Sequence, residues 1–171
     1  MSKKNYINNR DFFDAIVEYK KKCREAEDAG EEYPVVPDYI CQCFMQIANR
    51  LSTKPNFSGY SFIDDMRMDG IENCIRYVKN FNPDKTENPF AYFTQIIYYA
   101  FIRRITKEKE QLYIKYKSST KLIAAGETYH FEGEDTLYHK NDVDYMNNFV
   151  EDFEEKLEKD KEKRNAKSKS K

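Results

Sequence analysis

The 171-residue chain contains no tryptophan, two histidines and five glycines. So few histidines argue against a histidine-based metal or catalytic centre, and so few glycines leave no glycine-rich loop for binding phosphate. No apolar run approaches the roughly 20 residues that a membrane span needs, and the opening MSKKNYINNR lacks the apolar stretch of a signal peptide. We therefore expect a cytoplasmic protein that binds other molecules, with no enzymatic activity, no cofactor and no metal.

The four cysteines do not change this expectation. Cys23, Cys41, Cys43 and Cys74 lack the paired two-residue spacing that is typical of a zinc site. We expect reduced, partly buried thiols, as is usual in the cytosol.

The near-zero net charge hides strong segregation along the chain. The 29 basic and 30 acidic residues give a net charge of −1. Residues 100–122 carry seven basic side chains against two acids, whereas residues 127–162 carry thirteen acids against four lysines. The last nine residues, KRNAKSKSK, carry five positive charges and no large apolar group. Blocks of like charge indicate interaction surfaces or disordered tails.

Hydrophobic periodicity predicts an all-α fold. A first helix is expected to begin near Asp11, with Phe13, Ile16 and Val17 on its inner face, and to end by Gly30. A second is expected from Asp38, with a buried stripe at spacings of four, three and four residues: Ile40, Phe44, Ile47 and Leu51.

The remainder of the chain divides as follows. A third helix is expected over about 62–81 with Ile71, Cys74, Ile75 and Val78 inward, and a fourth over about 90–114. A loop over 118–141 and an acidic amphipathic helix over Tyr145–Leu157 complete the pattern. We predict an N-terminal helix and linker (1–37), a core domain (38–117), a loop with an acidic helix (118–162) and a basic disordered tail (163–171).

The third helix presents an acidic face. Asp65, Asp69, Glu72 and Arg76 recur at helical spacing. Neighbouring like charges repel by a few tenths of a kcal/mol per pair, which a basic partner would relieve. The alternative is an ordinary solvated helix face.

The fourth helix combines aromatic and basic residues. Phe90, Tyr92, Phe93, Tyr98, Tyr99 and Phe101 precede Arg103, Arg104, Lys107 and Lys109. Aromatic rings can stack unpaired bases while cations neutralise phosphates. The alternative is that the rings belong to the core, although six rings cannot all be buried on one side of a helix.

These two stretches carry a family resemblance. The segment IDDMRMDGIENCIRYVKNFN, followed by NPFAYFTQIIYYAFIRRITKEKE, resembles the second domain of bacterial sigma factors, and most of all the late-transcription sigma factors of T-even-like bacteriophages. Shared features include the opening NYxNN motif (Asn5, Tyr6, Asn8, Asn9), NFSGY at Asn56–Tyr60 and the Asp69–Gly70 pair with Phe81 eleven residues after the glycine. The resemblance covers about residues 5–117.

The resemblance implies two functional surfaces on a sigma-domain-2-like helical bundle. The third helix would dock on the clamp helices of the RNA polymerase β′ subunit through Asp65, Met68, Asp69, Ile71, Glu72 and Ile75. The fourth would recognise and melt an A·T-rich minus-ten promoter element through Tyr92, Gln95, Tyr98, Tyr99, Phe101, Arg103, Arg104, Lys107 and Lys109. Gln95 and Ile96 stand where housekeeping sigma factors have paired tryptophans.

The resemblance thus implies a sigma factor that directs host RNA polymerase to phage late promoters in the bacterial cytoplasm. The alternatives are a helical adaptor or inhibitor that binds the polymerase without opening promoters, and a small RNA-binding protein. The acidic helix over Tyr145–Leu157 could bind a sliding clamp or late co-activator, or instead cap the core.

Overall fold

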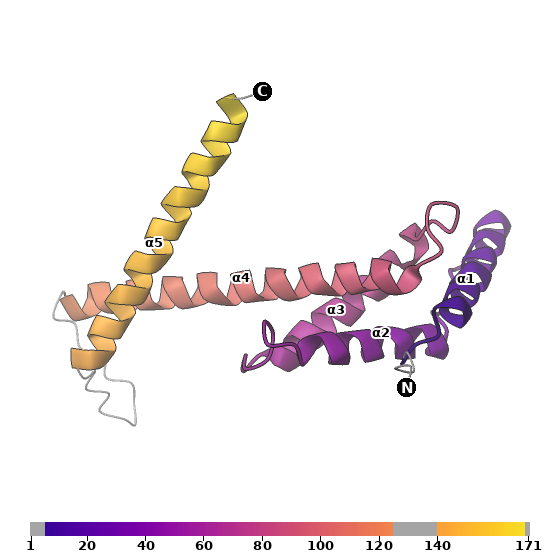
Figure 1. The fold of residues 1–171 in the computed structure, drawn as a ribbon, viewed down its shortest axis with the longest axis horizontal. Coiled ribbons are helices and arrows are strands. Elements are labelled where there is room, and N and C mark those ends of the chain that lie inside the picture. The colour runs from indigo at the N-terminus through magenta and orange to yellow at the C-terminus, as the bar shows by residue number, and fades with distance from the viewer. Residues whose placement is uncertain (1–5, 125–139, 170–171) are drawn as a thin grey trace, which may run out of the picture. The chain divides into compact units, whose positions relative to one another are not determined.

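Helices account for all of the regular structure in the computed structural model, which describes residues 6–124 and 140–169. They are α1 (Asn9–Ala29), α2 (Asp38–Ser52), α3 (Ile63–Tyr77), a short 3-10 helix η1 (Val78–Asn80), α4 (Pro89–Ala124) and α5 (Lys140–Lys169) (Figure 1). No strand occurs in these described residues, so the all-α class is confirmed.

Two compact units divide the chain, Met1–Ile105 and Thr106–Lys171, and α4 contributes to both. The sequence predicts divisions after residues 37, 117 and 162. Side chains of α1 are buried in the same core as those of α2, α3 and the first half of α4. The predicted loop over 118–141 is corrected at both ends, because α4 continues to Ala124 and α5 begins at Lys140. The rest of that loop, 125–139, lies outside the described residues.

Capping residues set the two ends of α1. The side chain of Asn8 accepts a hydrogen bond from the Arg10 amide (3.1 Å), so the helix begins before Asp11, the predicted cap. Gly30 ends the helix in the left-handed conformation at φ 70°, which glycine adopts without a side-chain clash. The buried face is Phe12, Ile16, Tyr19 and Cys23, and the predicted inward residue Val17 is exposed.

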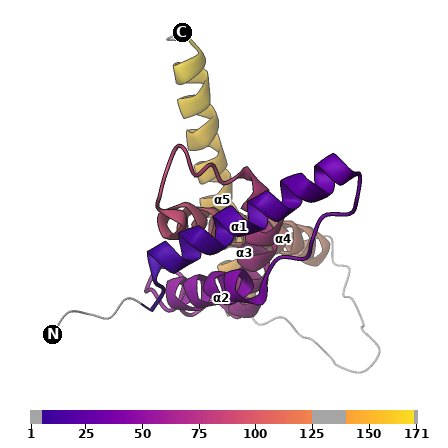
Figure 2. The ribbon, with the colours of Figure 1, turned by 90° about the vertical axis from the view of Figure 1, so that its right-hand side faces the viewer.

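Aromatic rings from three helices meet at the centre of the first unit. Phe44 of α2 lies 4.7 Å from Phe93 of α4 between ring centroids, and Phe12 of α1 lies 6.0 and 5.7 Å from these two rings. Edge and tilted contacts of this kind add to the free energy gained by burying the rings. Helices α2, α3 and the first half of α4 run alongside one another, and α1 crosses their end (Figure 2).

The N-terminus of α4 is capped from two directions. Asn88 accepts a hydrogen bond from the Ala91 amide (3.0 Å). Asn9 of α1 accepts one from the Phe90 amide (3.2 Å) and donates one to the Glu87 carbonyl (3.2 Å). The ring of Tyr6 also packs edge-on against Phe90 at 5.7 Å. Tyr6 and Asn9, about 80 residues before Phe90 in the chain, therefore lie against the start of α4.

Helices α3 and α4 lie in close contact at Gly70. A Cβ atom placed on Gly70 would lie 2.9 Å from Ile97 Cγ2 and 3.3 Å from the Phe101 ring. Both neighbours are fully buried, and side chains in a close-packed core have little room to move. Glycine at this position thus sets the spacing of the two helices.

Replacing Gly70 with alanine (Gly70→Ala) is expected to destabilise the protein by about 1–3 kcal/mol, because overpacking a closed core costs that much. The steric cost exceeds the roughly 1 kcal/mol by which alanine is the better helix former. Urea unfolding of the wild type and variant measures the difference. A variant as stable as the wild type would show that the two helices can separate freely here.

The second unit is built on aromatic contacts between the latter part of α4 and α5. Tyr113 stacks on Phe153 at 4.6 Å between centroids, and Tyr116 meets Phe149 edge-on at 5.4 Å. Glu154 accepts hydrogen bonds from the Tyr113 hydroxyl (2.7 Å) and from Lys117. The helix α5 continues to Lys169, so the prediction of a disordered tail from 163 is wrong up to that residue.

The second unit is expected to lose helix in acid. Hydrogen bonds from Lys117 and Tyr113 lower the pKa of Glu154, so the ionised carboxylate stabilises the fold above its ordinary pKa. That stabilisation is lost as the pH falls below about 4. Circular dichroism of the full chain between pH 7 and 3 should show the loss. Glu154→Gln should remove this acid-dependent loss of helix, whereas Glu151→Gln should keep it. An unchanged loss in Glu154→Gln would show that Glu154 is not the group responsible.

Candidate functional site

One solvent-facing stripe on α3 combines carboxylates with apolar side chains. Asp65, Met68, Glu72 and Ile75 recur at spacings of three, four and three residues and are all exposed. Met68 is 65% exposed and Ile75 is 41% exposed. The sequence placed Ile75 on the inner face, which is wrong: Met66, Gly70 and Cys74 are the buried residues of this helix. The structure thus brings four predicted docking residues together, and we call these four the α3 stripe.

Two other predicted docking residues lie at the edges of this stripe. Ile71 is partly buried and packs against the core. The carboxylate of Asp69 accepts hydrogen bonds from Arg104 of α4, at 2.7 Å to Nε and 3.0 Å to Nη2. Asp69 therefore already has a cationic partner within the first unit.

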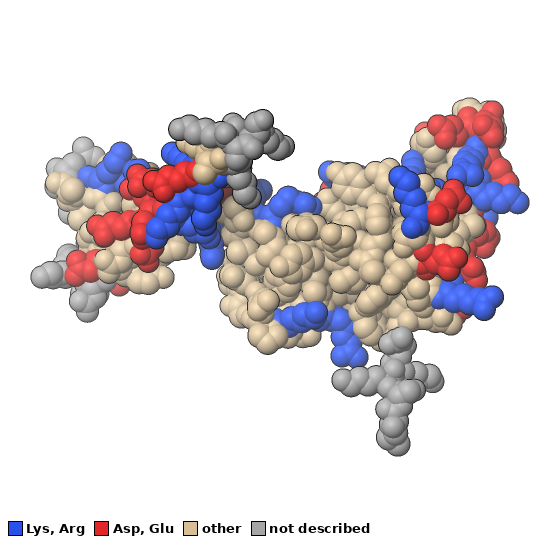
Figure 3. Space-filling model, turned by 45° about the horizontal axis from the view of Figure 1, so that its top comes forward, with Lys and Arg blue, Asp and Glu red and all other residues tan. Residues whose placement is uncertain are grey.

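The first half of α4 exposes a second stripe. Gln95, Tyr98, Tyr99, Ile102 and Arg103 lie on one face of the helix and all are exposed; we call them the α4 stripe. Tyr99 is the most exposed of its apolar and aromatic members, at 52%. Few charged side chains gather over this part of the first unit (Figure 3). A face of this kind can stack flat apolar groups, with one guanidinium available for an anion.

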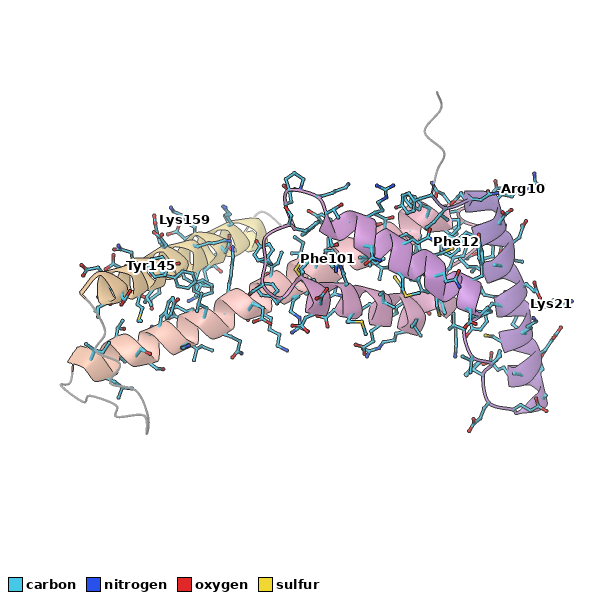
Figure 4. The ribbon with its side chains drawn as sticks, turned by 90° about the horizontal axis from the view of Figure 1, so that it is seen from below. Arg10, Phe12, Lys21, Phe101, Tyr145 and Lys159 are labelled. Atoms are coloured by element: carbon cyan, nitrogen blue, oxygen red, sulfur yellow. The ribbon has the colours of Figure 1, made fainter. Side chains whose placement is uncertain are left out.

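The other predicted DNA-binding aromatics belong wholly or partly to the core. Phe101 is fully buried with its ring 5.2 Å from Phe57, so the prediction that it meets a base is corrected. Phe12 and Phe101 both lie among the helices of the first unit (Figure 4). Tyr92 is partly buried against Phe81 at 5.3 Å, and this burial raises the pKa of its hydroxyl. The Tyr98 and Phe57 rings make an edge-to-face contact, with 5.5 Å between their centroids. Tyr99 is therefore the most accessible of the predicted rings.

The predicted basic residues are divided between the two units. Arg103 is exposed on the α4 stripe, whereas Arg104 is partly buried and paired with Asp69. Lys107 and Lys109 are exposed but belong to the second unit.

The acidic helix predicted over Tyr145–Leu157 is part of α5. Phe149 and Phe153 pack on α4 within the second unit. The sequence predicted instead that this helix binds a sliding clamp or co-activator, or caps the core. Tyr145 and Leu157 are left 60% and 40% exposed.

Sequence reasoning missed two residues of these surfaces. Ile102 is 40% exposed within the α4 stripe, and its spacing of four residues from Tyr98 could have indicated it. Asn9 holds the start of α4, which only the folded chain reveals.

Among residues 6–124 and 140–169, no three histidine, cysteine or acidic side chains gather as a metal site would require. Across the same residues, no helix has the length and apolar character needed to cross a membrane. Comparison with known proteins finds no family model and no curated sequence that matches the chain.

Proposed function

We propose that this chain is a sigma factor that directs a host RNA polymerase to phage late-type promoters. The observation that carries the proposal is the pair of exposed stripes in the first unit, acidic and apolar on α3 and aromatic on α4, borne by two helices in direct contact at Gly70. The order of these features along the chain is also that of the sigma-factor second domain, which the sequence resembles.

Docking would use the α3 stripe. Met68 and Ile75 are apolar side chains that a protein partner could bury, while Asp65 and Glu72 would steer a basic surface into register. The partner is the pair of β′ clamp helices of the polymerase.

Promoter opening would use the α4 stripe. Tyr99 would stack on a base that has left the duplex, which contributes about 1–3 kcal/mol per base towards the cost of unstacking. Arg103, four residues further on the same face, would hold a neighbouring phosphate without reading sequence. An A·T-rich element is the cheapest to open, and no covalent chemistry is required.

One observation favours a second candidate, a polymerase-binding adaptor or inhibitor that opens no promoter. The α4 stripe carries Arg103 but few other charges around it, and Arg104 is paired with Asp69. A charge-poor face suits a protein partner as well as a base, because phosphate binding depends on basic side chains.

Binding of the full chain to purified host core polymerase tests the docking that both candidates share. We expect saturable binding that a peptide of the β′ clamp helices competes away. Binding that the peptide leaves unchanged would place the docking elsewhere. Absence of binding would exclude both candidates and favour direct RNA binding, which a gel-shift assay with single-stranded RNA would then measure.

A further inference from the structure

The Asp69–Arg104 ion pair connects α3 to α4. Both carboxylate oxygens of Asp69 are used, one by Nε and one by Nη2 of the same guanidinium, which is the two-point geometry that fixes orientation as well as distance. The two side chains are 33% and 20% exposed, so the pair is screened less than the surface ion pairs of the molecule.

The pair stands beside a close contact between the two helices. Gly70, the next residue, brings α3 against Ile97 and Phe101 of α4. Gly70 fixes how far apart the helices lie. The two-point ion pair adds a directional constraint, since rotating or sliding α4 would break at least one of its two hydrogen bonds.

Arg104 follows directly after Arg103, and Tyr99 lies five residues before it on the same helix. Holding Arg104 therefore sets the direction in which Tyr99 and Arg103 point. A partner that took Asp69 as a docking contact would have to break both of its hydrogen bonds to the partly buried guanidinium of Arg104.

We propose that Asp69 is a positioning residue: it holds Arg104 and thereby fixes the α4 stripe relative to the α3 stripe, and it does not contact the polymerase. This inference rests on the proposed function and assigns docking to the α3 stripe alone. It also removes Arg104 from the residues that bind phosphate.

The test compares Asp69→Asn, Arg104→Gln and the exchange Asp69→Arg/Arg104→Asp with wild type. Asp65→Asn is the matched variant for a direct docking contact, because Asp65 is an exposed carboxylate of the α3 stripe four residues away on the same helix. The measurements are affinity for core polymerase, promoter opening followed by 2-aminopurine fluorescence, and urea unfolding. We expect Asp69→Asn and Arg104→Gln each to lower opening by about tenfold at saturating polymerase, which is the size of effect typical of coupling between residues of one ion pair. Their polymerase affinity should stay within about twofold, and the exchange should restore most of the opening.

A merely stabilising pair would change unfolding alone and leave opening by the folded variants unchanged, which would overturn the proposal. The proposal would also be overturned if Asp69→Asn lost as much polymerase affinity as Asp65→Asn and the exchange did not recover it. Asp69 would then be a direct contact with the polymerase. Failure of the wild type to bind polymerase would refute the proposed function instead. In that case the unfolding of the double variant Asp69→Asn/Arg104→Gln decides. Effects of the two single variants that add up in it would refute the positioning role as well, whereas non-additive effects would retain it for whatever partner the α4 stripe binds.

Discussion

Reversing the charge of Asp65 (Asp65→Lys) is expected to weaken binding to host core polymerase by about 30-fold or more. Asp65 is exposed at one end of the α3 stripe, where a basic partner surface would meet it. Removing one partner of a charge pair that an interface desolvates costs about 2–5 kcal/mol, and a lysine adds repulsion. Titration of fluorescently labelled chain with polymerase measures the change.

Asp14→Lys provides the matched control, because Asp14 is an exposed carboxylate on α1 and its replacement changes the net charge by the same amount as Asp65→Lys. We expect its polymerase affinity to remain within about twofold of wild type. Equal losses in both variants would mean that binding follows overall charge and that the α3 stripe is not a docking site.

Truncating Tyr99 (Tyr99→Ala) is expected to lower promoter opening by about 5- to 150-fold while leaving polymerase affinity unchanged. The range follows from the 1–3 kcal/mol that one stacked base contributes. Tyr99 has the most accessible ring of the α4 stripe, and its removal leaves the core intact. Opening is measured with 2-aminopurine in the non-template strand at saturating polymerase.

Two variants separate stacking from other effects. Tyr99→Phe keeps the ring and should retain most of the opening, whereas Tyr39→Ala removes an exposed ring from α2 and should behave as wild type. Full opening by Tyr99→Ala would contradict the stacking role and favour the adaptor function.

The sequence predicted best where one apolar stripe decides the orientation of a helix. Ile40, Phe44, Ile47 and Leu51 of α2 are all buried as their spacing predicted. In α3 the same reasoning failed at Ile75, because Met66, Gly70 and Cys74 form the buried face. An apolar residue on the exposed side, such as Ile75, has the same hydropathy as a core residue. In α4, helical spacing showed that six rings could not all be buried, but not that Tyr99 and Tyr98 would be exposed while Phe93 and Phe101 would not.

Contacts between distant segments could not be predicted at all. Asp69 and Arg104 lie 35 residues apart. The sequence assigns Asp69 to polymerase docking and Arg104 to DNA binding. Only the crossing at Gly70 brings them together. The pairing of Tyr113 and Tyr116 with Phe149 and Phe153 was similarly hidden, since periodicity reveals an apolar face but not what covers it.

Run-off transcription tests the central claim most directly. Host core polymerase would be supplied with this chain on a linear template carrying an A·T-rich minus-ten element, beside a template in which that element is replaced by G·C pairs. The account predicts a discrete transcript that requires both the chain and the A·T-rich element and that is lost with Asp65→Lys. Tight polymerase binding without any such transcript would contradict the sigma-factor function.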